Sequence, residues 1–600
     1  MVVEAARRLT LVLESMGRLG EAMAQADGKP VFVFGGIPGE EVVAEVVRDR
    51  RHYIAAEVVE VIKASPHRVA VPCPYFGRCT GCQWQHIEYG HQLELKHHAV
   101  EDALSRVGGL SGVTVLPTLG SPKQHEYRNH ARFTVRRNGG RLGYVHRERR
   151  RFVDIDRCML MVPQINDVLT KLQGRCAETT QLSVRYGVHS GSWLIQPSLK
   201  NSDIGLESGQ KHYEEAVNGA RFRVAASSFF QVNLFQMENL VKLLRDSLHL
   251  SGREVLVDAY AGVGTFAALL APYAAKVIAV EESASAVKDA RDNLAGHTNV
   301  EVRQGKTEAV LAEMSDEVDA VVLDPPRAGC QGQAIEALTR LAPARIAYVS
   351  CDAETLARDL KLLVAGPYQI AAVQPVDMFP QTHHIETLTT LVLKTGHPII
   401  LASASPRRRQ ILKDAGIAFR AQASDVEETS AHQQPEAYVV ALAPAKARAV
   451  AASLHRGTVL AADTIVVDGQ AILGKPRDHA HALEMLRQLR GREHKVMTGV
   501  AVVDASSGQS ASGIETTVVT MRPYTEEEAS TYVASGDAMD KAGSYAIQDA
   551  VFRPAASVEG CYLNVVGLPL CLAEKLLRQM GVALDTLPSP IECHHSHKGS

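Results

Sequence analysis

The sequence has 600 residues, of which 46% are hydrophobic and 22% are charged, and its formal net charge is -3. One hydrophobic core rarely supports a chain of this length, so several domains are expected, and the composition excludes a fibrous or disordered protein. The small net charge excludes a uniformly basic nucleic-acid binder. A basic surface must therefore be local, and residues 121–160 provide one, with eleven Lys and Arg against four acidic residues.

The sequence has no recognisable export or membrane segment. Residues 1–20 scatter charges among their apolar residues and lack the continuous apolar core of a secretory signal. The longest apolar region, residues 255–280, is interrupted by Asp258, two glycines and Lys276, as in a strand, turn and helix. The ten cysteines are too few for a disulfide scaffold of this size. These features predict a cytoplasmic protein.

Apolar periodicity divides the chain into five regions and predicts a multidomain α/β protein. Residues 1–64 carry short apolar runs between turn signals, the pattern of a small β-barrel. Residues 65–221 are a mixed segment with a cysteine cluster. Strands alternate with helices over residues 222–396, as in a doubly wound domain, and a second α/β pattern covers residues 398–585. Residues 586–600 have no apolar period and are expected to be disordered.

Four cysteines make a pattern that indicates a metal site. Cys73, Cys79 and Cys82 have the spacing C-x5-C-x2-C, and Cys158 follows after 75 intervening residues, beside the basic stretch. Thiols this close together are usually held as thiolates by a metal. Zinc and an iron-sulfur cluster both accept four thiolates, so the spacing alone leaves both open.

A glycine-containing turn follows a buried-strand pattern in the first α/β region. Val255-Leu256-Val257-Asp258 leads into residues 259–266, where glycines let the backbone approach a ligand at the carboxyl end of the strand. Glu281 ends the next strand, where a carboxylate can accept hydrogen bonds from ribose hydroxyls. Asp324 ends a third strand, and the two prolines after it stop the sheet.

The same edge of the sheet is expected to carry a nucleophile and a base. Cys351 follows a further strand, and Glu386 lies 35 positions later. A thiolate is a soft nucleophile and a tolerable leaving group, so it can add to an electron-poor ring and be eliminated afterwards. A carboxylate can remove the ring proton that this elimination requires.

These motifs resemble the RNA (uracil-5) methyltransferases over residues 1–396, and the cysteines resemble the iron-sulfur subgroup that acts on 23S ribosomal RNA. The resemblance implies an RNA-binding TRAM domain, an OB-like barrel, at residues 1–64. It implies S-adenosylmethionine as cofactor, contacted by Gln231, Tyr260, Thr265, Glu281 and Asp324. It implies Cys351 as nucleophile, Glu386 as base, and a structural [4Fe-4S] cluster on Cys73, Cys79, Cys82 and Cys158. Transfer RNA is the alternative substrate.

Four aromatic residues interleave the basic stretch. Tyr127, Phe133, Tyr144 and Phe152 could stack on RNA bases or could belong to the core, and the sequence leaves both open.

The second α/β region resembles the Maf family of nucleoside triphosphate pyrophosphatases, beginning with the turn Ser403-Ala404-Ser405-Pro406-Arg407-Arg408. The resemblance implies Asp463 as the base and Glu428 as a ligand of Mg²⁺ or Mn²⁺. It implies a possible homodimer, and Arg408, Thr464 and Gln548 resemble the subgroup that acts on dTTP and UTP. The residues expected to bind the nucleotide are Ser403, Arg407, Arg408, Lys446, Thr464, Lys475, Lys541 and Gln548.

The sequence therefore predicts a bifunctional enzyme. A competing hypothesis is an RNA-binding or division-regulating scaffold in which one domain is inactive. Intact Cys351, Glu386, Asp463 and Lys475 favour two working active sites.

Overall fold

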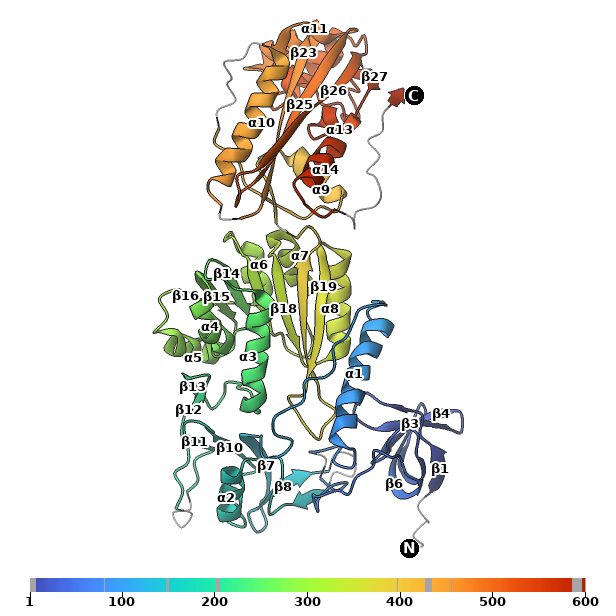
Figure 1. Cartoon of the computed structure of the whole chain (residues 1–600), viewed down its shortest axis with the longest axis vertical. Helices are drawn as coiled ribbons and strands as arrows, with labels where there is room; N and C mark the ends of the chain where they lie inside the picture. The colour runs from blue at the N-terminus through green and yellow to red at the C-terminus, as the bar shows by residue number, and fades with distance from the viewer. Residues whose placement is uncertain are drawn as a thin grey trace. The chain divides into compact units, whose positions relative to one another are not determined.

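The computed structural model describes residues 7–79, 81–146, 151–200, 205–396, 398–426, 434–454, 456–584 and 596–598. The chain forms two compact units, the first built mainly from residues up to 391 and the second mainly from residues after 391 (Figure 1). Within the described residues, no helix combines the length and apolar character needed to cross a membrane.

The first unit begins with a six-stranded sheet in the order β1-β5-β6-β4-β3-β2. β1 and β2 stand at the two ends of this order, paired with β5 and β3. They are successive parts of one chain segment, so the sheet closes on itself. Alternate residues such as Leu11, Val31 and Val42 fill its interior. The strands are β1 (Arg8–Val12), β2 (Ser15–Met16), β3 (Ala22–Ala26), β4 (Lys29–Phe34), β5 (Glu41–Asp49) and β6 (Ile54–Lys63).

A long helix and a second sheet follow. The sheet has the order β11-β10-β7-β8-β9 and packs against α2 through an apolar core. Tyr127 and Phe133 are fully buried, so the hypothesis that these two rings stack on RNA bases is wrong. The elements are α1 (Tyr89–Arg106), β7 (His130–Arg136), β8 (Arg141–Val145), β9 (Phe152–Asp154), α2 (Pro163–Leu172), β10 (Gln181–Tyr186) and β11 (Trp193–Gln196).

The largest sheet of this unit has seven strands in the order β16-β15-β14-β17-β18-β20-β19. Its strands β16, β15, β14, β17 and β18 are parallel. In β15, β14, β17 and β18, nearly continuous apolar runs are buried between helices. Ligands of such sheets bind beyond the carboxyl ends of the strands. The elements are α3 (Leu234–Leu248), β14 (Val255–Ala259), α4 (Thr265–Leu270), η2 (Ala271–Tyr273), β15 (Lys276–Glu281), α5 (Ala284–Leu294), β16 (Val300–Gln304), α6 (Thr307–Glu313), β17 (Ala320–Leu323), α7 (Gly332–Leu341), β18 (Arg345–Ser350), α8 (Ala353–Ala365), β19 (Tyr368–Val376) and β20 (Glu386–Leu393).

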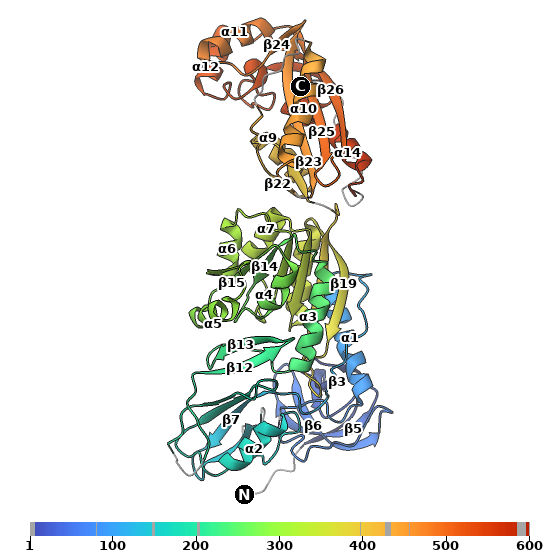
Figure 2. The same ribbon diagram turned by 60° about the vertical axis from the view of Figure 1, so that its left-hand side comes forward.

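A hairpin of β12 (His212–Val217) and β13 (Ala220–Ala225) precedes this sheet in the chain and lies beside α5 (Figure 2). The backbone N–H of Ala225 donates to the buried carboxylate of Asp289 on α5, at 2.8 Å. This bond anchors the segment that leads from β13 into α3.

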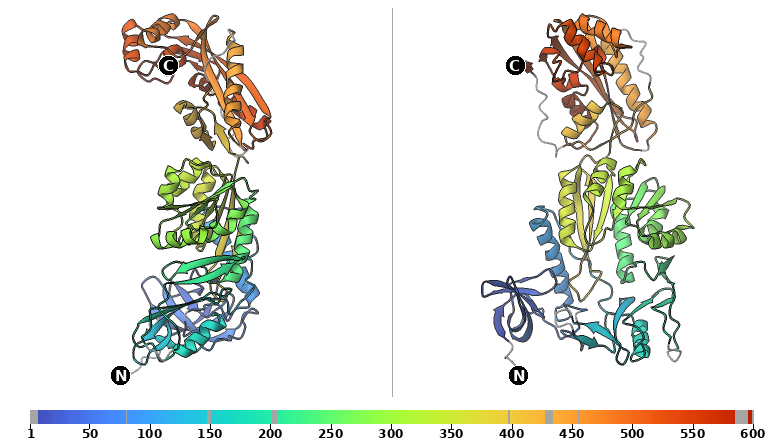
Figure 3. Two further views of the ribbon diagram at one scale, coloured as in Figure 1. Left: turned by 90° about the vertical axis from the view of Figure 1, so that its left-hand side faces the viewer. Right: turned by 180° about the vertical axis from the view of Figure 1, so that it is seen from behind.

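The second unit is built on long antiparallel strands, β23, β25 and β26, with α10 along them, drawn in orange in Figure 3. The full sheet has the order β22-β21-β23-β25-β26-β27-β28, and β24 pairs with β23. The elements are β21 (Ile399–Leu401), α9 (Pro406–Asp414), β22 (Phe419–Ala421), α10 (Pro435–Ala451), β23 (Thr458–Asp468), β24 (Ala471–Leu473), α11 (His479–Leu489), β25 (Glu493–Asp504), β26 (Ser510–Met521), α12 (Glu526–Ala534), η3 (Ala542–Ser544), β27 (Ala555–Glu559), α13 (Tyr562–Val566), α14 (Leu570–Gln579) and β28 (Ser596–Lys598).

The expected disordered tail, residues 586–600, lies outside the described residues except at β28. There the backbone of Ser596–Lys598 pairs with β27, so the structure differs from the expectation at these three positions.

Candidate active sites

The four patterned cysteines line one cavity. Cys73, Cys79, Cys82 and Cys158 surround a volume of about 300 Å³, which Arg128 also borders. All four are free thiols. Burial raises the pKa of Cys79 to about 11 and that of Cys82 to about 12, and Arg128 opposes both shifts. A bound cation would reverse the effect of burial, because it stabilises thiolates directly.

Hydrogen bonds hold the cysteine segments in place. The side chain of Asn166 on α2 accepts from the Cys158 N–H at 2.8 Å and donates to the Cys158 carbonyl at 3.0 Å. The amide of Gln85 donates to the sulfur of Cys82 at 3.1 Å. Cysteines from two segments that are distant in the sequence therefore line one cavity.

At the carboxyl edge of the seven-stranded sheet, the turn after β14 contacts the end of β15. The Gly262 N–H donates to one carboxylate oxygen of Glu281 at 2.9 Å, and the Ser283 N–H donates to the other at 2.8 Å. Gly264 has φ +83° and a Cβ there would lie 2.8 Å from Leu294, so only glycine fits without a shift. A Cβ on Gly262 would meet nothing within 4 Å, which shows that this turn faces open space.

A buried carboxyl group lies under this turn. Asp258 is fully buried at the end of β14, and its Oδ2 accepts from the Ala267 N–H at 2.8 Å. Its Oδ1 has no hydrogen-bond partner within the described part of the chain. Burial, together with Asp324 and Glu281, raises the pKa of Asp258 to about 8. Asp258 therefore supports the turn from beneath, whereas the Glu281 carboxylate and the glycine turn lie where a ligand can reach them.

Glu386 lies close enough to Cys351 to perturb the pKa of its thiol. Burial and the charge of Glu386 raise the pKa of Cys351 to about 11, and a hydrogen bond and the charge of Arg327 oppose this shift. Burial and the neighbouring Asp324 raise the pKa of Glu386 well above its ordinary value. Burial also raises the pKa of Asp324, to about 7. The edge therefore gathers a thiol, two carboxyl groups and one guanidinium.

The segment before Glu386 is fixed by buried polar contacts with α1. Lys96 donates to Asp377 at 2.5 Å, and both side chains are fully buried. The Tyr89 hydroxyl donates to the other oxygen of Asp377 at 2.9 Å. The amide of Gln92 donates to Gln381 at 3.0 Å. These contacts leave little freedom to the chain that positions Glu386.

Two of the remaining positions expected to contact the cofactor, Tyr260 and Thr265, follow β14 at this edge. Tyr260 directly follows β14 with φ +66°, and Thr265 is the first residue of α4. Gln231 precedes α3, and its carbonyl accepts from Asn129 at 3.4 Å.

The second unit has a polar cavity of about 490 Å³ at the carboxyl end of β21. All eight residues expected to bind the nucleotide line it, and so does Asp463: Ser403, Arg407, Arg408, Lys446, Asp463, Thr464, Lys475, Lys541 and Gln548. Glu428, the expected metal ligand, lies outside the described residues.

Contacts within this cavity pair its charges. The Lys446 ammonium lies 2.6 Å from Asp463. Arg408 donates to Thr464 at 3.1 Å, to Ser403 at 3.2 Å and to the Gly567 carbonyl at 2.8 Å. The cavity thus combines carboxylates with several donors suited to phosphate oxygens.

Sequence reasoning did not assign a role to three residues that the structure adds to these sites. Asp258 was recognisable only as the end of a strand. Arg327 follows the two prolines after Asp324, a position from which its contact with Cys351 could have been suspected. Asp540 lines the second cavity and pairs with Lys541 at 2.5 Å, next to it in the sequence.

Comparisons with known proteins agree with this division. The family model described as tRNA (Uracil-5-)-methyltransferase matches residues 206–394, and that described as Maf-like protein matches residues 398–580. Uncharacterized RNA methyltransferases from Gloeobacter violaceus and Halalkalibacterium halodurans are each 32% identical to the chain, over 64% of its length and 96% of theirs.

A solved structure is similar over the same part of the chain. It is the tRNA (uracil-54, C5)-methyltransferase of Pyrococcus abyssi in complex with S-adenosyl-L-homocysteine, which is 25% identical with a TM-score of 0.51, covering 64% of this chain and all of that one. The chain belongs to the RNA (uracil-5) methyltransferase family, and a Maf-like domain follows the methyltransferase part.

Proposed function

We propose that the first unit methylates carbon 5 of a uridine in RNA with S-adenosylmethionine, and that the second hydrolyses a nucleoside triphosphate. The observation that supports methylation best is the gathering of Cys351, Glu386, Asp324 and Arg327 at one edge of the sheet. A thiol and a nearby carboxyl are the groups that covalent attack on a pyrimidine and removal of its proton require.

The cofactor fits beside that edge. The open turn at Gly262 and the Glu281 carboxylate offer a backbone surface and acceptors for a nucleoside with hydroxyl and amino groups. Gln231, Tyr260, Thr265 and Asp324 would complete the binding site. When bound, S-adenosylmethionine supplies a methyl group made electrophilic by its sulfonium. It is the cofactor expected for this family, and the relative from Pyrococcus abyssi was solved with the demethylated product.

Cys351 would activate the uracil ring. Its thiolate adds to carbon 6, the sulfur–carbon bond forms, and the electron pair of the ring double bond moves toward the oxygen on carbon 4. Arg327 favours the thiolate, because its positive charge opposes the raised pKa of Cys351. The ring then has a nucleophilic carbon 5.

Glu386 would complete the reaction as base. After carbon 5 has been methylated, the carboxylate takes its proton, the double bond re-forms and the sulfur–carbon bond breaks. The raised pKa of Glu386 makes it a stronger base than an exposed glutamate. Asp324 sustains that raised value through like-charge repulsion.

The cysteine cavity would hold a metal group. Its four thiols, Cys73, Cys79, Cys82 and Cys158, suit either a zinc ion or an iron-sulfur cluster. The resemblance of these cysteines to the iron-sulfur subgroup favours a [4Fe-4S] cluster. The cluster would join the segment of Cys73 to that of Cys158 as a structural staple.

We propose 23S ribosomal RNA as the substrate, because the cluster cysteines mark the subgroup that the sequence resembles. Transfer RNA is the second candidate, since the relative from Pyrococcus abyssi acts on uracil 54 of tRNA. The closed N-terminal sheet, with the strand order of an OB-like barrel, would contribute RNA contacts as a TRAM domain. Mapping 5-methyluridine in RNA from a deletion strain separates the two candidates.

The second unit would act on dTTP or UTP and release the monophosphate and pyrophosphate. Arg407, Lys475 and Lys541 surround the cavity with positive charge that suits a triphosphate. Asp463 would deprotonate the attacking water. A bound Mg²⁺ or Mn²⁺ supplies Lewis acidity at the phosphate under attack.

Two substitutions test the assignment. Cys351→Ala should abolish transfer of labelled methyl to RNA and leave pyrophosphate release unchanged, and Asp463→Asn should do the reverse. Loss of both activities from either folded variant would contradict two independent sites. Inactivity of the wild-type chain toward RNA, with pyrophosphatase intact, would favour the scaffold hypothesis for the first unit.

A further inference from the structure

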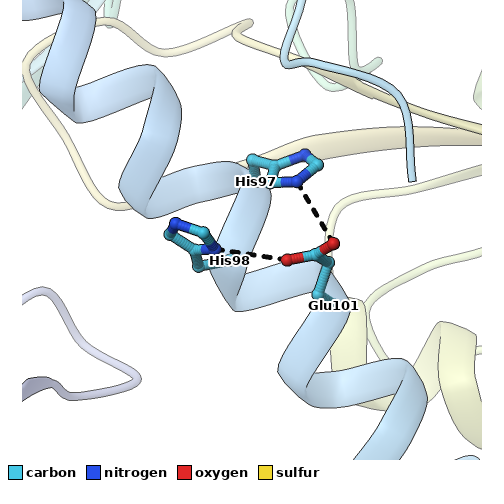
Figure 4. A group of neighbouring side chains, drawn as sticks. All are labelled: His97, His98 and Glu101. Carbon is cyan, nitrogen blue, oxygen red and sulfur yellow. Dashed lines mark hydrogen bonds and ion pairs between the residues drawn. The ribbon is translucent and has the colours of Figure 1, made fainter. Parts of the chain in front are cut away.

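Three side chains on α1 converge outside the active site (Figure 4). His97 Nε2 lies 3.2 Å from one oxygen of Glu101, and His98 Nδ1 lies 3.2 Å from the other. One ligand atom from each residue lies within 4.8 Å of those of the other two. Residues four and three positions before Glu101 necessarily share its side of a helix, so the helix itself sets this geometry.

The hydrogen bonds of His97 leave a place for a cation. Its Nδ1 faces the Leu116 carbonyl at 3.1 Å, and that oxygen can only accept, so Nδ1 carries the hydrogen. Its Nε2 lies 3.2 Å from a Glu101 oxygen, so this nitrogen and the carboxylate are placed to bind one cation together.

The Leu116 contact also has the form of outer support for a metal ligand. Histidines that bind metals usually donate their other ring nitrogen to a carbonyl or carboxylate, which fixes the ring orientation. Leu116 belongs to the segment in which Val115 and Leu119 form bridges to β19. A metal on His97 would therefore stiffen the attachment of α1 to the edge of the sheet.

We propose that His97, His98 and Glu101 bind one divalent transition-metal ion of the Zn²⁺ class. Two imidazoles and one carboxylate favour Zn²⁺, Co²⁺ or Ni²⁺ over Mg²⁺ or Ca²⁺, which prefer oxygen ligands. The side chain of His98 is 69% exposed and that of Glu101 45% exposed, so an ion can enter from solvent and keep water ligands. None of the three residues lines the cysteine cavity or the cavity of the second unit.

Lys96, the residue before His97, indicates which part of the structure a bound ion would stabilise. Lys96 precedes His97 and holds Asp377, on the path to Glu386. The buried face of α1 thus holds the segment before Glu386 through Lys96. A metal on His97 would stabilise the exposed face of the same helical turn.

Zinc content of the full chain tests the proposal. Wild type and variants, each with the cluster reconstituted, are dialysed to equilibrium against Zn²⁺, and bound zinc is counted by mass spectrometry. We expect wild type to hold one more equivalent than Glu101→Gln or His98→Ala, with at least tenfold weaker binding in the variants. His52→Ala removes an exposed histidine from the turn between β5 and β6 and should match wild type. Zinc bound elsewhere contributes equally to all four proteins.

A structural readout makes the result independent of stoichiometry. Crystals of the full chain soaked in Zn²⁺ should show an anomalous-scattering peak between His97, His98 and Glu101, absent from Glu101→Gln. Equal zinc content in wild type and both variants, or no peak among these three side chains, would overturn the proposal whether or not the chain methylates RNA.

Discussion

The two candidate active sites handle charge in opposite ways. At the edge of the seven-stranded sheet, Glu386 and Asp324 face each other, and burial raises the pKa of both. In the cavity of the second unit, the Asp463 carboxylate contacts the Lys446 ammonium, and further cations surround it. The first site thus raises the pKa of its carboxyl groups, whereas the second neutralises its carboxylate with a nearby cation.

This difference matches two kinds of chemistry. A reaction on a neutral ring needs groups that accept and release a proton, so a raised carboxyl pKa is useful. A reaction on a triphosphate needs positive charge that is present before the substrate binds. Substitutions at the first site should therefore alter proton transfer, and those at the second should alter anion binding.

The largest effect should come from Glu386→Gln. Without the carboxylate, the proton on carbon 5 stays, so turnover should fall by about 10²–10⁴-fold and the RNA should remain bonded to Cys351. A protein–RNA band on a denaturing gel measures this. The double variant with Cys351→Ala is the control and should give no band. A Glu386→Gln protein that turns over normally without a trapped adduct would show that the base lies elsewhere.

The next effect is on stability. Lys96→Met leaves the buried Asp377 without its cation, which should lower the free energy of unfolding by about 3–5 kcal/mol. Chemical denaturation measures the change. Replacing both partners, Lys96→Met with Asp377→Asn, should recover most of the loss. If the single and double variants were equally unstable, packing around α1 would matter more than the ion pair.

A smaller effect should follow from Arg327→Gln. Loss of the guanidinium removes stabilisation of the Cys351 thiolate, so the pKa of Cys351 should rise further above about 11. At any pH below that value the thiolate fraction falls, and alkylation by iodoacetamide should slow by about tenfold for each unit of rise. The pH profile of alkylation should move to higher pH. Arg291→Gln, on the exposed side of α5, should leave the profile unchanged.

Much of the fold could be predicted because strand periodicity is a local signal. The expected apolar runs in the N-terminal region correspond to β1, β4, β5 and β6. β3, Ala22–Ala26, was missed, since alanine and glutamine have little strand propensity and its pairing with β4 decides its conformation. The strand ends that carry Glu281, Asp324 and Cys351 were found because motifs mark them.

Contacts between distant segments could not be predicted. The fixing of Asp377 by Lys96 joins residues 281 positions apart, and no local spacing links the two. The burial of Tyr127 and Phe133 was likewise undecidable, because an aromatic residue in a basic stretch has the same pattern inside or outside a core. The site residues came from local spacing, whereas their support came from tertiary packing.

The smallest effect should come from Asp540→Asn in the second unit. Asp540 is 65% exposed and competes for Lys541 and Arg407, at 2.5 and 3.9 Å, so removing its charge should free both cations for the triphosphate. Exposed ion pairs contribute only up to about 1 kcal/mol, so KM should fall by no more than about fivefold with kcat little changed. Added salt should reduce the difference, because screening weakens exposed pairs. Asp537→Asn, a neighbouring exposed carboxylate, is the matched control. A large fall in kcat for Asp540→Asn would instead place its carboxylate in the reaction itself. The second site would then depend on two carboxylates, as the first depends on Glu386 and Asp324.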